Sequence, residues 1–263
     1  MRHWLAISLI FIMTGCETNN KNMDKIIFLH HSTGEAIWKG KTNRYIYRLT
    51  GKGDVQKYIG THNRKNKTNY NITAVNFPKS VPYGWNNYPY DYYNIWVKNA
   101  GNTPFLEEPT LEILTTKYNV IIFKHCFPVS RINPDTGTPD INSDVKSIEN
   151  YKLQYDALKH KMHEFPDKKF IVWSPAANTK NKSQEDEAIR TREFYSWMIN
   201  EWDEKGDNIF IWDFYNYETE GGLYLTDKNA HSPDNSHPGI EFSAKLAPLF
   251  GQFIIDVIES KID

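Results

Sequence analysis

The chain has 263 residues and a formal net charge of −1, and 40% of its residues are hydrophobic. A chain of this length can bury one substantial core, so a single domain is expected. The nearly balanced charge argues against a nucleic-acid-binding protein, which would need a basic surface. Eight Trp, 16 Tyr and 14 Phe are present. Such rings suit stacking on sugars in a cleft, and they suit an ordinary core equally well.

The N-terminal residues predict an export signal. A short basic start precedes an apolar run over residues 4–13, and Met13-Thr14-Gly15-Cys16 resembles a bacterial lipobox. We therefore expect residues 1–15 to be a lipoprotein signal peptide and Cys16 to carry lipid that anchors the protein to a membrane of the bacterial cell envelope. Residues 16–24 are expected to be a tether and residues 25–263 the domain. Cys126, the other cysteine, is expected to be packed rather than reactive.

The stretch Ile26-Ile27-Phe28-Leu29-His30-His31-Ser32-Thr33-Gly34 predicts a buried β-strand followed by a sharp turn. Ser32 then lies just past the carboxyl end of the strand, where open α/β sheets bind their ligands. Its hydroxyl is a poor nucleophile unless a neighbouring base accepts its proton. As a plain alternative, serine is also a common first residue of a helix.

The rest of the chain alternates apolar runs with helix-length segments, which favours a parallel sheet covered on both faces. Residues 35–70 show little periodicity and are expected to be an irregular excursion. Helices are expected over residues 148–165, 184–202 and 240–259, and the last is predicted to bury Phe242, Leu246, Leu249, Phe253 and Val257. The four further strands are expected at Asn71–Phe77, Asn119–Phe123, Lys169–Ser174 and Asn208–Asp213.

A candidate base lies near the end of the chain, in Asp234-Asn235-Ser236-His237-Pro238. The short spacing would let the Asp234 carboxylate fold back onto the His237 imidazole, fix its tautomer and stabilise its protonated form. Asp213 is a rival for this role because it follows the fifth predicted strand at the same edge of the sheet. Its plainer role would be to cap the next turn.

With Ser32 near the start and Asp-x-x-His near the end, the chain resembles the SGNH/GDSL-type hydrolases, in particular secreted bacterial members. The matching pieces are Phe28–Gly34, Phe123–Pro128 and Asp234–Pro238. The resemblance implies an α/β fold, a three-layer α/β/α sandwich around a mostly parallel five-stranded sheet of the flavodoxin-like kind. It also implies hydrolysis of esters on sugars, lipids or small acyl groups by a Ser32-His237-Asp234 triad, with no cofactor.

Two family features are missing. His30-His31 precedes the serine where the family usually has Gly-Asp, and Lys124-His125-Cys126-Phe127 occupies the place of the Gly-x-Asn-Asp block. The block normally supplies an amide to the oxyanion hole. The candidate replacements are the backbone amide of Ser32, the Lys124 ammonium and Gly84, although a solvated lysine and a tight-turn glycine are the ordinary interpretations.

Three functions remain open from the sequence. The first is a serine esterase that removes O-acetyl or other acyl groups from a carbohydrate. The second is transfer of the acyl group to a sugar hydroxyl. The third is a surface lipoprotein that binds glycans without catalysis. A zinc site built from His30, His31, His125, Asp234 and His237 is disfavoured, because neighbouring strand residues point to opposite faces.

Overall fold

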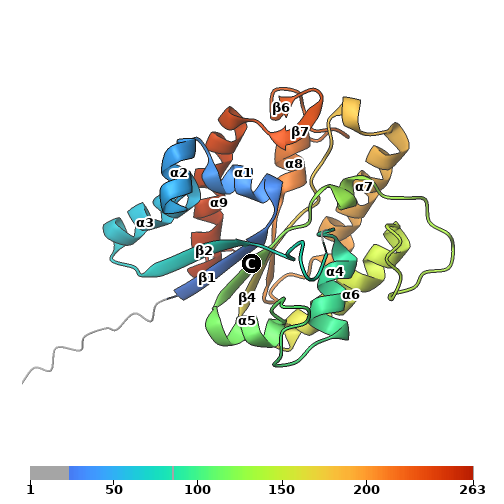
Figure 1. Cartoon of the computed structure of the whole chain (residues 1–263), viewed down its shortest axis with the longest axis horizontal. Helices are drawn as coiled ribbons and strands as arrows, with labels where there is room; N and C mark the ends of the chain where they lie inside the picture. The colour runs from blue at the N-terminus through green and yellow to red at the C-terminus, as the bar shows by residue number, and fades with distance from the viewer. Residues whose placement is uncertain (1–23, 85, 263) are drawn as a thin grey trace, which may run out of the picture.

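The computed structural model describes residues 24–84 and 86–262 (Figure 1). The predicted signal peptide, Cys16 and the tether up to residue 23 lie outside these residues. The described part contains no helix that is both long and apolar enough to cross a bilayer.

A five-stranded parallel sheet forms the centre, in the order β2-β1-β3-β4-β5 (Figure 1). The predicted fold class and all five strands are confirmed, with ends that differ from the expected ones by one residue at most at the four later strands. The strands are β1 (Asp24–His30), β2 (Tyr70–Asn76), β3 (Val120–Phe123), β4 (Lys169–Trp173) and β5 (Ile209–Trp212).

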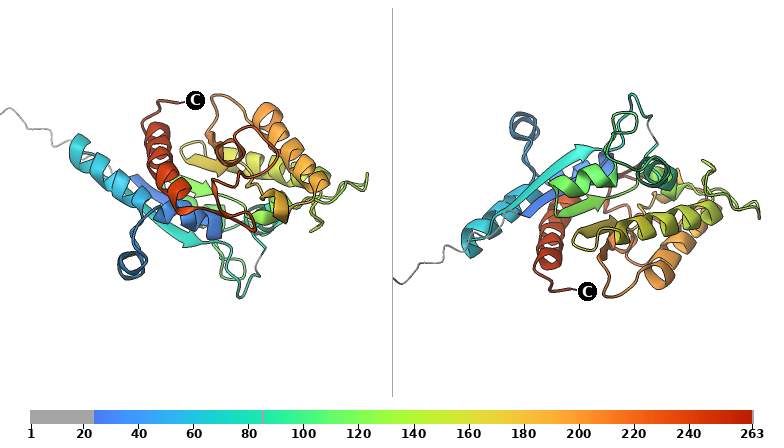
Figure 2. Two further views of the ribbon diagram at one scale, coloured as in Figure 1. Left: turned by 90° about the horizontal axis from the view of Figure 1, so that it is seen from above. Right: turned by 90° about the horizontal axis from the view of Figure 1, so that it is seen from below.

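Helices cover both faces of the sheet, as the apolar strands require (Figure 2). Successive side chains of β1 point to opposite faces of the sheet, so Ile27 and Leu29 belong to one hydrophobic core and Ile26 and Phe28 to the other. The first face is packed by α4 (Pro89–Tyr93), π-helical η1 (Asn94–Lys98), α5 (Leu111–Lys117), α6 (Ile148–His163), α7 (Glu185–Trp197) and π-helical η4 (Met198–Trp202). The second is packed by α1 (Ser32–Lys39), α3 (Asp54–Asn66), α8 (Phe214–Thr219) and α9 (Ile240–Ile258).

The prediction of an irregular excursion over residues 35–70 is wrong. The chain forms α1, α2 (Arg44–Thr50) and α3 there. Helix α3 buries only Val55 and Ile59 among its 13 residues, and α2 buries none. Since α3 buries so few residues and α2 none, neither helix has the buried periodic face on which the sequence-based prediction depended.

The C-terminal helix is confirmed, but its buried face needs two corrections. Phe253 is only partly buried, although it packs against the core. Phe242 and Leu246 are buried, and the stripe continues through Phe250 and Ile254 at four-residue steps. Leu249 lies at the margin of this stripe and is 41% exposed, so it does not belong to the core. Between α8 and α9 the chain forms a short antiparallel hairpin, β6 (Ala230–Ser232) and β7 (Asn235–Pro238), where the sequence predicted a loop.

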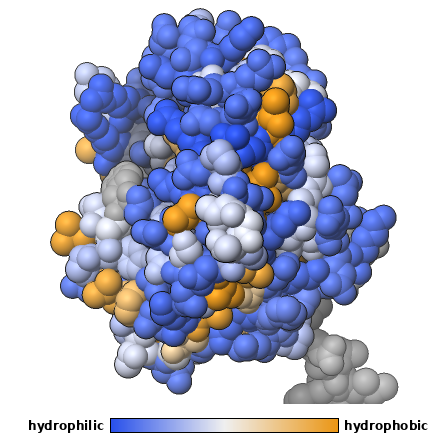
Figure 3. Space-filling model, turned by 90° about the vertical axis from the view of Figure 1, so that its right-hand side faces the viewer, coloured by the Kyte–Doolittle hydropathy of each residue, from blue (hydrophilic) through white to orange (hydrophobic). Residues whose placement is uncertain are grey.

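Two short 3₁₀ turns complete the fold, η2 (Phe127–Ser130) after β3 and η3 (Lys180–Lys182) after β4. On the face shown in Figure 3, apolar side chains form small groups separated by hydrophilic ones.

Candidate active site

Ser32 is the first residue of α1, directly beyond the carboxyl end of β1, and it is exposed. The Glu35 amide is the first to bond back into the helix, to the His31 carbonyl at 3.0 Å. The amides of the three residues before it, Ser32 among them, have no acceptor within the helix. The positive end of α1 thus lies at the serine, where it suits a developing negative charge.

Close packing fixes this helix end on the sheet. A Cβ atom at Gly34 would lie 2.6 Å from His30 Cβ and 2.8 Å from Lys124 Cδ. Both distances are too short for real carbon atoms, so only glycine lets α1 begin this close to β1 and β3. The Thr33-Gly34 pair that predicted a turn is therefore used for close approach.

His237 lies on β7, which packs beside α1 (Figure 1). Its ring is nearly perpendicular to that of Phe127, with ring centres 5.3 Å apart. Its Nδ1 lies 2.8 Å from Asn235 Oδ1, and its backbone N–H donates to the same oxygen at 3.1 Å. Because a backbone N–H can only donate, the oxygen of the amide faces the histidine, and Nδ1 carries the ring proton. Nε2 is then an unprotonated acceptor, and it has no partner among the residues that the structure describes.

The environment of His237 favours the neutral ring. Burial lowers the pKa of His237 below its ordinary value of 6.5, and the nearby charges of Lys124 and His231 lower it further. An imidazole that is neutral at pH 7 is able to accept a proton.

Neither candidate carboxylate is bonded to His237. Asp234 is exposed in the turn of the hairpin and accepts a hydrogen bond from Asn181 Nδ2 at 3.2 Å. Asp213 accepts from Ser174 Oγ at 3.3 Å and from Tyr195 OH at 3.1 Å, and it caps α8 through the Asn216 amide. Asp213 thus has the structural role that its position after β5 also allowed.

Asn235 is the residue that sequence reasoning missed. In a strand, residues two apart share a face, so Asn235 and His237 lie together. Asp234 belongs to the turn before the strand. The opposite face of β7 carries Ser236, whose Oγ is buried and accepts from the Thr179 amide at 3.0 Å, which ties the hairpin to the chain after β4. The sequence could have indicated this pairing through the alternation of Asn235-Ser236-His237-Pro238. That alternation places Asn235 beside His237 only if the segment is assumed to be a strand.

Lys124 is buried under the site and is not the solvated side chain of its ordinary interpretation. It is only 1% exposed, and its Nζ donates to Cys126 Sγ at 3.4 Å. The sulfur in turn lies 4.0 Å from both Ser32 Oγ and Thr33 Oγ1. Cys126 is itself buried, as predicted. Lys124 therefore acts on the site through its charge, with the thiol between it and the serine.

Two more buried groups lie near Lys124 with few partners. Glu218 accepts from the Ala177 amide at 2.6 Å through one oxygen, while its other oxygen has no partner among the described residues. Burial raises the pKa of Glu218 to about 8, although the Ala177 amide and Lys124 oppose the shift. His125 is also buried, and neither of its ring nitrogens is bonded within the described part of the chain.

Gly84 lies in the loop after β2, and its amide donates to the Lys79 carbonyl at 3.3 Å. The N–H proposed from the sequence as an oxyanion donor is thus used inside its own loop.

The candidate metal ligands do not converge. His30 Nδ1 bonds the His31 carbonyl at 3.1 Å, and His31 Nε2 bonds the Pro78 carbonyl at 2.7 Å. Across residues 24–84 and 86–262, no three His, Cys, Asp or Glu side chains are arranged to hold a metal ion.

No model of a known protein family matches the chain, and no curated protein matches it in sequence. The function of the site therefore has to be inferred from its geometry. An exposed serine lies at a helix N-terminus, and a neutral histidine of fixed tautomer lies on the adjacent hairpin.

Proposed function

We propose that the protein is a serine esterase, with Ser32 as nucleophile and His237 as general base. The observation that carries this proposal is the fixed tautomer of His237, whose Nε2 is unprotonated. His237 lies on β7, which packs beside α1, the helix that begins at Ser32. Asn235 takes the place that a carboxylate has in the common triad, since it orients the imidazole.

The reaction follows from these positions. His237 Nε2 accepts the hydroxyl proton while Ser32 Oγ attacks the ester carbonyl, and the free amides at the start of α1 stabilise the oxyanion. His237 then returns the proton to the alcohol as the C–O bond breaks, which leaves an acyl-enzyme. A water molecule, activated by the same nitrogen, releases the acid and restores the serine.

The serine must turn to engage the base. Ser32 Oγ lies 4.0 Å from Cys126 Sγ, its partner in the structure. Because Ser32 is exposed, its hydroxyl can rotate between staggered positions at little cost. Hydrogen bonds of catalytic groups are often long before substrate binds and shorten in the complex.

The substrate we propose is an acylated carbohydrate, with O-acetyl groups as the typical case. Phe127 beside His237 is partly exposed and supplies an aromatic ring for contact with a sugar. The resemblance to SGNH/GDSL-type hydrolases and the lipobox-like Met13–Cys16 support an esterase held at the bacterial cell envelope by lipid on Cys16. A sugar hydroxyl in place of water would make the same acyl-enzyme a transferase.

One observation favours a second candidate, a glycan-binding protein without catalysis. Within the described residues, Ser32 and His237 share no hydrogen bond. If the serine never engages the base, the surface around Ser32 and His237 would bind a glycan and release it unchanged.

Covalent labelling of Ser32 by a fluorophosphonate separates the two candidates. We expect intact-mass analysis to show one adduct, peptide mapping to place it on Ser32, and His237→Gln to abolish it. His62→Gln is the matched control, because it removes a histidine outside the site. A folded wild-type protein that takes no label would exclude the esterase and leave the binding protein.

A further inference from the structure

Helix α2 stands apart from the body of the molecule (Figure 2). It contains no buried residue, yet three of its seven side chains are large, apolar and exposed. Tyr45 is 73% exposed, Ile46 52% and Leu49 87%. Isolated apolar residues on a surface are common, but this density on one short helix is unusual and points to a partner.

The helical period orders these side chains into an inward and an outward side. Tyr47 is partly buried and packs against the core shared by α1, α3 and α9. At 100° per residue, Tyr45 and Leu49 lie together on the opposite side of the helix, pointing away from the body. Arg44 and Arg48, also four residues apart, form a basic row beside them.

The surrounding segment is strongly basic. Residues 39–52 include no Asp or Glu, whereas the whole chain has a net charge of −1. The basic residues of this segment are Lys39, Lys41, Arg44, Arg48 and Lys52. An outward apolar tip with a basic border is the pattern of helices that lie in the interface of a membrane.

We propose that α2 docks on an anionic lipid surface. Tyr45, Ile46 and Leu49 enter the boundary between headgroups and acyl chains, while Arg44 and Arg48 contact lipid phosphates. A folded protein partner fits less well, because a stable interface buries roughly 800 Å² on each side, far more than three side chains on a protruding helix offer. The proposal does not depend on esterase activity.

Docking through α2 would also orient the candidate site. Helix α2 follows α1, and Tyr47 lies near Glu35 in the first turn of α1. Burial, together with the Glu35 carboxylate, raises the pKa of Tyr47 to about 12. The helix end that carries Ser32 would thus be held at a fixed height above the lipid.

A probe on α2 tests the proposal locally, whatever residues 1–23 do. In the full-length Cys16→Ser chain, Tyr45→Cys is labelled with an environment-sensitive fluorophore (NBD). Vesicles of phosphatidylcholine and phosphatidylglycerol in a 3:1 ratio should shift its emission to the blue. Phosphatidylcholine vesicles should not, and neither should a probe at Ile189→Cys on α7, in the opposite layer. Labelling of the Cys16→Ser chain alone measures any reaction of buried Cys126.

The charge requirement is tested separately. With the probe in place, Arg44→Gln/Arg48→Gln should weaken partitioning into the anionic vesicles about 30-fold, because each arginine near such a surface contributes about fivefold. The double variant Lys117→Gln/Lys205→Gln removes the same charge elsewhere and should leave partitioning within about twofold of wild type.

Three outcomes would overturn the proposal. The first is an unchanged probe at residue 45 in anionic vesicles, whether or not the chain floats with them. The second is an equal shift with vesicles of phosphatidylcholine alone. The third is a shift without vesicles that grows with protein concentration, which would assign the surface to a second copy of the chain.

Discussion

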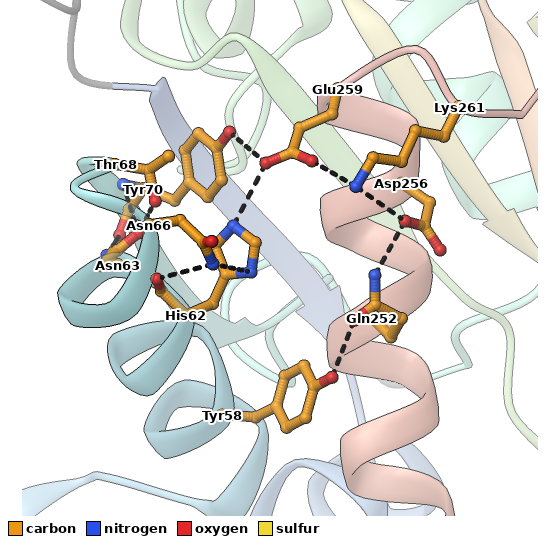
Figure 4. A network of polar contacts seen from close by, with 10 residues as sticks. All are labelled: Tyr58, His62, Asn63, Asn66, Thr68, Tyr70, Gln252, Asp256, Glu259 and Lys261. Atoms are coloured by element: carbon orange, nitrogen blue, oxygen red, sulfur yellow. Dashed lines mark hydrogen bonds and ion pairs between the residues drawn. The ribbon is translucent and has the colours of Figure 1, made fainter.

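Two histidines at opposite ends of the sheet differ in their hydrogen-bond partners, and the difference separates the proposed general base from a structural histidine. His237, at the carboxyl ends of the strands, bonds the neutral amide of Asn235 through one nitrogen and leaves the other free. His62, near the amino ends, has both nitrogens occupied (Figure 4). Its Nε2 lies 3.1 Å from Glu259 Oε1, and its Nδ1 lies 3.1 Å from the Asn66 side-chain amide.

The contrast extends to the groups around each histidine. At the amino end, Glu259 also accepts from Tyr70 OH at 3.0 Å and pairs with Lys261 at 2.6 Å, so that α3 and the end of α9 are tied together (Figure 4). At the carboxyl end, Lys124 and Glu218 are buried with one hydrogen bond each. Paired and partly exposed charges add modestly to stability, whereas buried groups with few partners reduce it and are retained where chemistry needs them.

The largest expected effect comes from removing the reactive pair. Ser32→Ala and His237→Gln should each lower kcat/KM for p-nitrophenyl acetate by a factor on the order of 10⁴ or more. The double variant should be hardly slower than either single one, because the two residues act as a unit. His62→Gln should keep the wild-type rate. Multiplied losses in the double variant would show that Ser32 and His237 act independently.

Changing the partner of His237 should alter its acidity. Asn235→Asp places a carboxylate beside Nδ1, which stabilises the protonated ring and should raise the pKa of His237. The acid limb of the kcat/KM profile should follow this pKa, which burial lowers in the wild type, and should therefore move to higher pH in the variant. Asn235→Ala should cost about tenfold in kcat/KM, equivalent to one lost hydrogen bond.

Asp234→Asn is the matched control for this prediction, since it changes a neighbouring side chain that bonds Asn181 instead. NMR titration of the His237 ring follows the pKa even if the protein has no esterase activity. A fall in the pKa of His237 on Asp234→Asn, with no rise on Asn235→Asp, would return the orienting role to Asp234.

A variant of Glu218 should show how much folding stability is lost by burying a carboxyl group at the carboxyl end of the sheet. Its pKa is 4.5 in an ordinary setting and about 8 in the folded protein, so the unfolded chain releases this proton first and stability falls as pH rises between these values. Glu218→Gln removes the cost and should raise the free energy of unfolding by about 2 kcal/mol at pH 8, with little effect at pH 4.

Urea unfolding at the two pH values measures this gain. Glu220→Gln, two residues away and exposed, should show no such gain at pH 8. An equal change at pH 4 and pH 8 for Glu218→Gln would mean that ionisation of Glu218 is not the cause.

The smallest expected effect lies at the amino end. Lys261, together with Tyr70 and His62, lowers the pKa of Glu259 below 4.5. Its contribution to stability is therefore complete above pH 4.5 and is lost as pH falls through the folded pKa. Glu259→Gln should lower the free energy of unfolding by about 1 kcal/mol at pH 7 and by much less at pH 3. A loss of the same size at both pH values would assign the effect to packing.

The sequence by itself determined the layered α/β fold. The five apolar runs match β1 to β5 closely, because a strand buried on both faces has to be apolar along its length. It also placed Ser32 at the carboxyl end of β1, since Thr33-Gly34 ends the run. Helices α2 and α3 were not predictable, because they bury almost nothing.

The partner of His237 was decided only by tertiary structure. The spacing Asp234-x-x-His237 suggested a carboxylate that folds back through a loop. The chain instead pairs β6 with β7, and Ser236 is fixed to Thr179 after β4. Once residues 235–238 are a strand, the period of two places Asn235 beside His237 and leaves Asp234 in the turn. The strand forms through contacts between segments that are distant in the sequence, so the residues around His237 do not predict it.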